Sequence, residues 1–337
     1  MLDAVLAGAE HWRDGVARAR EVDLTHIPDR SGLSGVVVCG MGGSGIAGDV
    51  AAVTAAGSGS LPVTVAKGFR VPVFTDARTL VVLASYSGNT EETLTCFEQA
   101  RERGAPTVVV ATGGRLGEMA RIHGVPSVVP AAGMQPRAAF PYLAAAVLIV
   151  LERLGVIGDL TADLVEIDAV LREQSALCGP AAAEARNPAK QIASALDGAL
   201  PVIWGQEGVL AVAATRWKTQ FNENAKVPAY AAAVPELGHN EVVGLGPGAP
   251  PASALAIAAL RAPNEDPRTA RRIEAALRLA RERGARTSEA HVHGLSPLAQ
   301  LASGVQLGDL ASVYAAVLRG VDPTPVEAIE RLKTEVS

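Results

Sequence analysis

The sequence predicts an α/β protein with two doubly wound parallel sheets, and two observations support this prediction. Short runs of Val, Ile and Leu alternate along the chain with longer stretches that are amphipathic or rich in Ala. Continuous apolar runs, rather than alternating polar and apolar residues, are typical of strands that a parallel sheet buries on both faces. The length of 337 residues suits about two domains of ordinary size.

The composition is that of a globular chain and argues against several classes of function. Aromatic residues make up only 4%, which disfavours a surface on which nucleic-acid bases stack. The net charge is −5 and the basic residues are scattered, so we expect no nucleic-acid partner. The first residues do not resemble a secretory signal, and the apolar run 138–151 is shorter than the ~20 residues of a membrane span. We therefore expect no membrane partner.

The cysteines and histidines are not arranged as a metal site. Cys39, Cys96 and Cys178 are far apart and show no Cys-x-x-Cys spacing, which predicts free thiols in a reducing cytoplasm. His291 and His293 alternate on a predicted strand without a cysteine or carboxylate beside them, so we interpret them as packing residues. The sequence thus predicts no metal.

Residues 1–155 are predicted to form the first domain. It opens with an amphipathic helix over about residues 1–22. The segments GVVVCGMGGSGIAGDVAAV and TLVVLASYSGNTEETLTCFEQARERG each read as a strand, a turn and a helix. Further strands are expected in PVTVAKG, PTVVVATG and PSVVP, and further helices near 116–122 and from 138 onward.

The rest of the chain repeats this plan. Residues 156–195, rich in Ala, Leu and charges, are predicted to be a helical connection, and residues 196–337 a second α/β domain. Its strands are expected in LPVIWG, SALAIAALRA and TSEAHVHG. Its helices are expected in EGVLAVAATRWKTQFNENAK, DPRTARRIEAALRLARERG, PLAQLASGVQLGDLASVYAAVLRG and the closing segment PTPVEAIERLKTEVS.

The first glycine-rich turn, GMGGSG at 40–45, satisfies G-x-G-x-x-G between a strand and a helix. This pattern raises the hypothesis of a nucleotide-dependent oxidoreductase, but the next strand ends in Lys67 where that fingerprint requires an acid. The glycines still let an anion approach backbone N–H groups at the start of a helix. A tight turn without any ligand is the alternative.

The second turn, at 85–92, brings three hydroxyls to the end of the next apolar strand. Thr90 alone could cap the following helix by accepting a backbone N–H, but one cap needs only one hydroxyl. The others can donate to phosphate oxygens at the carboxyl ends of neighbouring parallel strands, where open α/β sheets bind ligands. Together the two turns predict a phosphomonoester site formed by Gly42, Ser44, Ser85, Ser87 and Thr90.

These turns also resemble a known family. GMGGSG followed by SYSGNTEET is similar to the sugar isomerase (SIS) domain, whose serine-rich turn holds the phosphate of a phosphosugar. PRAAFP at 136–141, FNEN at 221–224, ELGHNE at 236–241 and RLK at 331–333 resemble motifs of the bifunctional phosphoglucose/phosphomannose isomerases, and the similarity runs from about residue 35 to 333. The resemblance implies two SIS-type subdomains and a C-terminal helix. It also implies a homodimer that interconverts glucose 6-phosphate and mannose 6-phosphate with fructose 6-phosphate without a cofactor.

The resemblance further implies roles for individual side chains. Glu223 carries a proton between C1 and C2 through a cis-enediol, which is a natural task for a carboxylate. His239, from the neighbouring subunit, opens the sugar ring with help from Lys333. Arg137 stabilises the charge of the enediolate. In this family a threonine near the C-terminus is linked to tolerance of both C2 epimers, and Thr324 is the nearest candidate.

Each catalytic candidate also has an interpretation without catalysis. Glu223 and His239 could be solvated surface residues, and Lys333 could be a cation on a frayed C-terminus. Arg137 could be exposed, stacking on Tyr142 or pairing with an acid. A regulator that senses a phosphosugar would need the two turns but not all four side chains together, and this is the alternative function.

Overall fold

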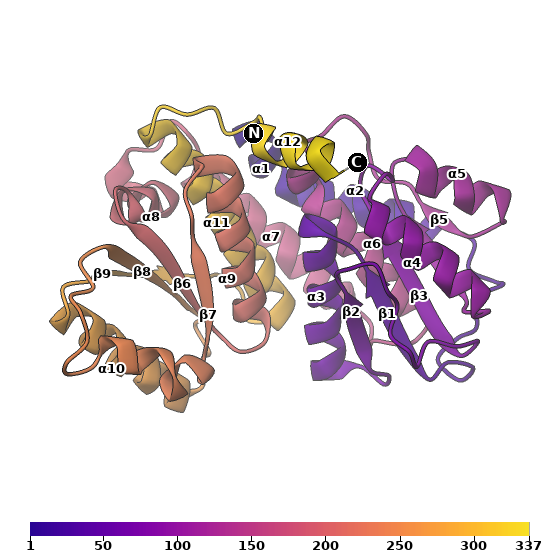
Figure 1. Ribbon diagram of the computed structural model, residues 1–337, viewed down its shortest axis with the longest axis horizontal. Helices are drawn as coiled ribbons and strands as arrows, with labels where there is room; N and C mark the ends of the chain where they lie inside the picture. Colours follow the sequence, from indigo (N-terminus) through magenta and orange to yellow (C-terminus); the bar gives the residue numbers. More distant parts are fainter. Residues whose placement is uncertain (337) are drawn as a thin grey trace. The chain divides into compact units, whose positions relative to one another are not determined.

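The structure is a computed structural model that describes residues 1–336 (Figure 1). These residues form two compact units. The N-terminal unit contains residues 7–169 and 296–298, and the C-terminal unit contains residues 1–6, 170–295 and 299–336. Each unit has its own parallel sheet flanked by helices, which confirms the predicted α/β class.

The sheet of the N-terminal unit has five strands in the order β2-β1-β3-β4-β5. All neighbouring strands are parallel, with Val37 opposite Val81 in the central pair. The two central strands are buried along their whole length, as their continuous apolar runs predicted. The strands are β1 (Gly35–Cys39), β2 (Val63–Ala66), β3 (Thr79–Ala84), β4 (Thr107–Val110) and β5 (Ser127–Val128).

Helices cover both faces of this sheet. Alternate residues of the central strands pack with α4 and α5, while the face that carries Val38 meets α3 at Gly48. The helix α6 contacts α2 and α3 as well as β3 and β4. The predicted opening helix is divided into two helices. The first of these, α1 (Leu2–Leu6), belongs to the C-terminal unit. The elements of the N-terminal unit are α2 (Gly8–Glu21), α3 (Gly42–Ser58), α4 (Glu91–Glu102), α5 (Gly114–Ile122), a 3₁₀ turn η1 (Pro136–Ala139) and α6 (Phe140–Arg153).

The sheet of the C-terminal unit has four parallel strands in the order β7-β6-β8-β9. Its edge strand β7 was not predicted, because Tyr230–Val234 contains three alanines in a row, which have low strand propensity. Pairing along β6 holds this segment extended. The strands are β6 (Leu200–Gln206), β7 (Tyr230–Val234), β8 (Leu255–Arg261) and β9 (Arg286–His291).

The helices of this unit lie on both sides of its sheet, because right-handed crossovers toward opposite edges place α9 and α10 on opposite faces. By length and composition α11 could cross a membrane, but 89% of its most apolar window is buried, as in a core helix. The elements are α7 (Thr161–Leu177), η2 (Glu184–Arg186), α8 (Pro188–Leu196), α9 (Val209–Gln220), η3 (Phe221–Ala225), η4 (Glu236–His239), η5 (Glu241–Leu245), α10 (Pro267–Glu282), α11 (Pro297–Leu318) and α12 (Glu327–Val336).

Candidate active site

The predicted phosphate turns meet at one edge of the N-terminal sheet. The strands β1 and β3 are neighbours and parallel, so the turns that follow them lie side by side at their carboxyl ends (Figure 1). From this pair the chain proceeds toward β2 on one side and toward β4 on the other. A ligand crevice is expected at such a switch point of an open α/β sheet.

The first turn leads directly into α3. Gly42 starts this helix with a φ of +52°, a conformation that glycine adopts without strain. Met41, at the N-cap, supplies no side-chain acceptor to the first turn, so the leading N–H groups of α3 are not capped from within. Ser44 is buried in that same turn. The Ser44 N–H donates to the Met41 carbonyl at 3.0 Å, so the N–H groups ahead of it, at Gly42 and Gly43, are the ones placed to donate to an anion.

The second turn is held together by its own hydroxyls. Ser85 is only 2% exposed, and its Oγ lies 2.8 Å from the Thr90 Oγ1 and accepts the Gly88 N–H at 3.1 Å. Thr90 occupies the N-cap of α4 without a side-chain capping bond, so the interpretation of Thr90 as a simple cap is wrong. Ser87 is exposed, and its Oγ accepts the Asn89 N–H at 3.3 Å. A hydroxyl that accepts one hydrogen bond can still donate another, so Ser87 can donate to a ligand at the surface.

A close approach of two backbones fixes the shape of this second turn. Gly88 has a φ of +69°, and a Cβ at this position would lie 1.9 Å from the carbonyl oxygen of Gly113. The Gly88 carbonyl accepts the Leu116 N–H at 2.8 Å, and the Asn89 side chain accepts the Arg115 N–H at 3.0 Å. The serine-rich turn is thus rigid before any ligand arrives.

Arg137 is a buried cation in the same unit as the two phosphate turns. It is 4% exposed and lies on η1, which contacts α3, and its Nη1 is 3.5 Å from the Gln135 Oε1. The interpretation of an exposed arginine is therefore wrong.

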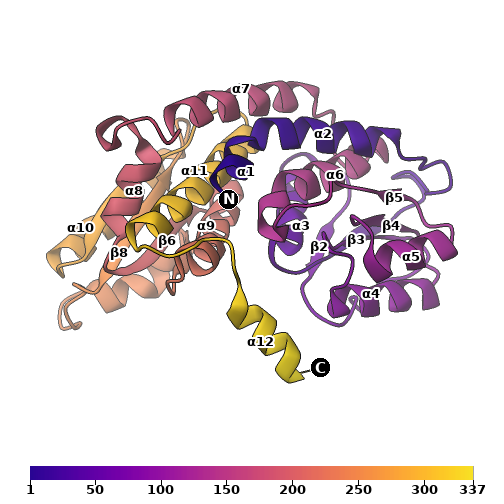
Figure 2. The ribbon, with the colours of Figure 1, turned by 90° about the horizontal axis from the view of Figure 1, so that it is seen from above.

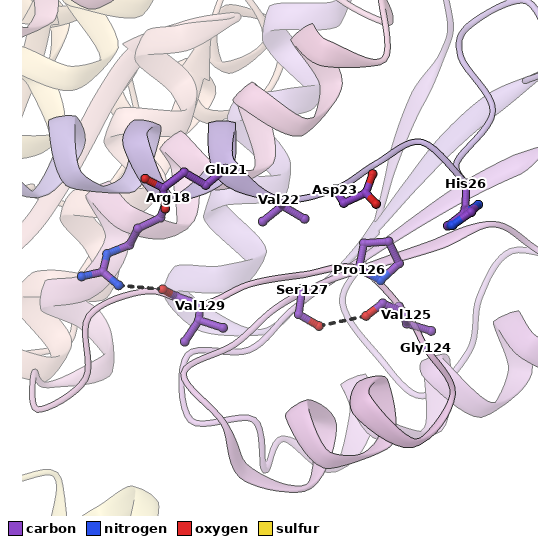
Figure 3. Close-up of a pocket in the computed structure, with 10 residues that line it drawn as sticks. All are labelled: Arg18, Glu21, Val22, Asp23, His26, Gly124, Val125, Pro126, Ser127 and Val129. Atoms are coloured by element: carbon purple, nitrogen blue, oxygen red, sulfur yellow. Dashed lines mark hydrogen bonds between the residues drawn. The ribbon is translucent and has the colours of Figure 1, made fainter.

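A separate pocket of about 540 Å³ in this unit contains none of the predicted site residues. It lies between the end of α2 and the segment around β5, where the Arg18 guanidinium donates to the Val129 carbonyl (Figure 3). Its acidic residues Glu21 and Asp23 would repel a phosphate. We therefore do not place the substrate there.

In the C-terminal unit, Glu223 lies on a single π-helical turn, η3, that extends α9. Asn222 before it accepts the Ala229 N–H at 2.9 Å, and the fully buried Asn224 after it donates to the Ser312 Oγ at 2.9 Å. The two asparagines turn away to these partners, and Glu223 between them is partly exposed. Isolated π turns occur frequently at functional sites.

A buried network between α9 and α11 supports this turn. The Ser312 hydroxyl donates a hydrogen bond to the Asp309 carbonyl at 2.7 Å, and the Asp309 carboxylate accepts two bonds from Arg216 at 2.9 and 2.8 Å. Arg216 is 1% exposed. The indole of Trp217 donates to the Gly304 carbonyl at 2.6 Å, and a Cβ on Gly308 would overlap its ring. The π turn is therefore anchored to a tightly packed helix pair.

Glu223 lines a pocket of about 560 Å³ that lies wholly within the C-terminal unit. Its other wall is the C-terminal segment from Val321 to Ile329, which leaves α11 as an extended stretch before α12 begins (Figure 2). Lys333 is four residues beyond Ile329 and so lies one turn further along the same face of α12. Thr324 is part of the extended stretch, where its N–H donates to Asp322 at 2.8 Å.

His239 is at the opposite end of the C-terminal sheet from Glu223. The helix α9 returns the chain from the carboxyl end of β6 to the amino end of β7, where η3 carries Glu223. His239 follows the carboxyl end of β7 on the 3₁₀ turn η4 and is exposed. The strand β7 has five residues, which span about 16 Å. The topology thus separates these two candidates within one copy of the chain.

Sequence reasoning missed the residues that hold the site in place. Asn222 and Asn224 were read only as flanks of Glu223, and their alternation around a carboxylate was the available signal. Ser312 and Arg216 had no signal, because their partners lie 88 and 93 residues away in the chain. Among residues 1–336, no group of three or more His, Cys, Asp or Glu side chains could hold a metal ion.

Known proteins of related sequence and fold share this architecture. A family model described as the bacterial phospho-glucose isomerase C-terminal SIS domain matches residues 185–336. The C-terminal domain of glucosamine-fructose-6-phosphate aminotransferase from Francisella tularensis has the same fold, with a TM-score of 0.78 at 16% identity over 96% of this chain and 98% of that chain. Tagatose-6-phosphate ketose/aldose isomerase from Escherichia coli also has this fold, with a TM-score of 0.69 at 13% identity over 96% of this chain and 94% of that chain.

Sequence relatives are more specific. A bifunctional phosphoglucose/phosphomannose isomerase from Caldicellulosiruptor bescii is 35% identical over 90% of this chain and 89% of the relative, and one from Aquifex aeolicus is 35% identical over 91% and 92%. A D-glucosamine-6-phosphate 4-epimerase from Sulfolobus acidocaldarius is 32% identical over 69% and 70%. With 35% identity over nine-tenths of its length, the chain belongs to the bifunctional phosphoglucose/phosphomannose isomerase family.

Proposed function

We propose that the protein is an aldose–ketose isomerase that interconverts glucose 6-phosphate and mannose 6-phosphate with fructose 6-phosphate. The observation that carries this proposal is the 35% identity over nine-tenths of the chain to isomerases of this specificity. The geometry supports it, because the chain combines rigid hydroxyl-bearing turns at a switch point with a carboxylate presented into a pocket. The reaction moves hydrogen within one sugar, so it is redox-neutral overall and requires no cofactor.

The phosphate group is held by the N-terminal unit. The helix N-terminus at Gly42 supplies backbone donors and a favourable dipole, and Ser44, Ser87 and Thr90 supply hydroxyls. Ser85 holds the second turn in shape through Gly88 and Thr90. These donors are neutral, so they bind the phosphate without a cation in the phosphate turns themselves.

The reacting carbons are served by charged side chains. His239 and Lys333 open the ring by proton transfer at the ring oxygen and the anomeric hydroxyl. Glu223 then removes the proton from C2 of the aldose, and the enediol accepts that proton at C1 to give the ketose. Arg137 faces the oxygens on which negative charge develops, and such preorganised stabilisation is worth about 3 kcal/mol in comparable sites.

The active form is a homodimer in which each site takes His239 from the neighbouring subunit. This proposal rests on the sheet of the C-terminal unit, whose opposite ends carry Glu223 and His239. The exposed segment around His239 includes Val243, which is 74% exposed and suits contact with a second copy. We place the enzyme in the cytoplasm, in keeping with its three free, buried cysteines.

The decisive experiment is an activity assay on one preparation with fructose 6-phosphate as substrate. We expect both glucose 6-phosphate and mannose 6-phosphate to accumulate, with each product identified by NMR because one relative is named as an epimerase. If the purified protein binds the sugar phosphate but shows no turnover, the function is that of a phosphosugar-sensing regulator. Tight binding of NAD(P) would instead favour the oxidoreductase hypothesis.

A further inference from the structure

We propose that Lys226 is a positioning residue that clamps the C-terminal segment, and with it Lys333, onto the turn that carries Glu223. This inference rests on the proposed function for the roles of Glu223 and Lys333. The clamp itself is a set of contacts within the C-terminal unit. The Lys226 Nζ donates to the Glu223 carbonyl at 2.5 Å, to the Pro325 carbonyl at 2.5 Å and to the Pro323 carbonyl at 3.4 Å.

The three acceptors match the three donors of an ammonium group. One acceptor belongs to the π turn, and two belong to the extended segment between α11 and α12, 97 and 99 residues further along the chain. The ammonium is also close enough to Asp322 to help lower the pKa of that carboxyl, which the Thr324 N–H lowers most. Lys226 therefore joins two parts of the pocket wall.

The backbone conformation of Lys226 indicates that its side-chain contacts offset an unfavourable φ. Its φ of 57° and ψ of 38° are left-handed, and every other residue with positive φ in the described part of the chain is a glycine. Glycine is the usual residue at the position that ends a helix in this conformation, because a Cβ is unfavourable there. A lysine in its place retains an unfavourable backbone and gains the clamp.

Ordinary capping of the helix end does not account for these contacts. A different cation already caps the C-terminal end of η3, because the Arg319 Nε donates to the Ala225 carbonyl at 3.0 Å. The N–H of Lys226 itself closes the turn on the Phe221 carbonyl. Two of the three ammonium donors go instead to the C-terminal segment, which a cap would not require.

The C-terminal segment needs such a tie because it buries little apolar surface. Ile329 is 41% exposed and Leu332 is 60% exposed, so hydrophobic burial contributes little to fixing α12. Pro325 and Ile329 line the same pocket as Glu223. Holding the Pro323 and Pro325 carbonyls therefore sets where α12 begins, and this in turn sets the distance from Lys333 to the substrate.

Hydrogen exchange on the full-length protein tests the clamp without any assay of activity. Lys226→Met keeps the length of the side chain and removes its donors. We expect amide exchange to accelerate about tenfold or more in peptides covering 322–335 and to stay unchanged elsewhere. The matched control is Lys218→Met, which removes a cation from the last turn of the same helix α9. Unchanged exchange in the Lys226 variant would overturn the proposal.

A double-mutant cycle tests whether Lys226 acts through Lys333. We expect Lys226→Met to lower kcat about tenfold with KM within about twofold, and Lys226→Arg to recover part of the loss, because a guanidinium can donate to the same carbonyls. Adding Lys226→Met to Lys333→Met should then cost no further activity within about twofold. Multiplicative losses, or a fully active Lys333→Met, would overturn this coupling.

The two experiments keep this inference separate from the proposed function. If the wild-type protein shows no turnover of any hexose 6-phosphate, the proposed function fails while hydrogen exchange still decides whether the clamp exists. If the protein is an active isomerase and the exchange rates do not respond to Lys226→Met, the clamp fails while the proposed function stands.

Discussion

At the scale of single residues, the structure distinguishes side chains that the sequence placed together. Ser85 and Ser87 were expected to bind phosphate alike, yet Ser85 is buried with its Oγ engaged inside the turn, and Ser87 is exposed. Glu223 is partly exposed and lines a pocket, as a base that must reach a substrate requires. Its role as the proton carrier stays a prediction.

Glu223→Gln tests that role. The amide keeps the size of the side chain and cannot accept a proton, so we expect kcat for fructose 6-phosphate to fall at least about 100-fold. Binding of the sugar phosphate, measured by calorimetry, should change little because the phosphate is held elsewhere. The matched control is Glu327→Gln, at another carboxylate that lines the same pocket. A fully active Glu223→Gln would show that another group is the base.

Alanine substitutions at the two serines should affect different properties, stability at Ser85 and substrate binding at Ser87. Ser85→Ala removes a buried hydroxyl with two partners, so the free energy of unfolding should fall by about 1–3 kcal/mol. Ser87→Ala should leave stability within about 0.5 kcal/mol. It should raise KM for fructose 6-phosphate at least about tenfold, because a bond to a charged phosphate is lost. Thermal unfolding and steady-state kinetics on both variants measure these effects. A stability loss at Ser87 and a KM increase at Ser85 alone would contradict the roles given to the two serines.

At the scale of elements, close backbone approach shapes the phosphate turn. Gly88 is in the left-handed region, and the carbonyl of Gly113 occupies the space where its Cβ would go. The same turn is tied to α5 through the Leu116 N–H. Two adjacent turns are thus built against each other, and this is why the loop has a defined shape without ligand.

Gly88→Ala should therefore be far more damaging than an alanine at an unobstructed glycine. Gly104 provides the control, since its φ of +68° is nearly identical and nothing lies within 4 Å of a Cβ there. Gly104→Ala should cost about 1–2 kcal/mol, the ordinary penalty of the left-handed region. Gly88→Ala should cost more than about 3 kcal/mol, because the backbone must also move. Chemical denaturation measures both, and equal losses would refute the packing argument.

At the scale of the whole molecule, the C-terminal unit separates Glu223 from His239 by the length of its sheet. In the mechanism we propose, the catalytic groups of one site therefore come from two copies of the chain. This separation follows from the topology. A helix that connects two parallel strands ends at the amino end of the second strand, and that strand then carries the chain to its carboxyl end. The sequence around either residue alone does not reveal this separation.

Subunit mixing tests this arrangement. Glu223→Gln and His239→Ala homodimers should each be inactive, but a mixed dimer contains one site with both native residues. Random exchange of equal amounts should restore about one quarter of wild-type activity, from half the dimers with one intact site each. Wild-type protein mixed with either variant provides the reference for exchange. No recovery after demonstrated exchange would place both residues in the same subunit.

The sequence by itself determined most of the elements and the position of the two turns, because both follow from local chemistry. The apolar run GVVVC has high strand propensity and is a buried strand here, and hydroxyls directly after a strand lie at its carboxyl end. The motifs also identified the family, which the comparisons confirmed. The assignments of Arg137, His239 and Lys333 to catalysis stay predictions from those motifs.

Only the tertiary structure decided how the site is held. The alanine-rich β7 is a strand because β6 pairs with it, and the π turn is anchored by Ser312 on a distant helix. The Lys226 clamp joins carbonyls almost a hundred residues apart. Such contacts depend on which surfaces pack together after the chain has folded. The order of residue types along the sequence does not specify which distant residues come into contact.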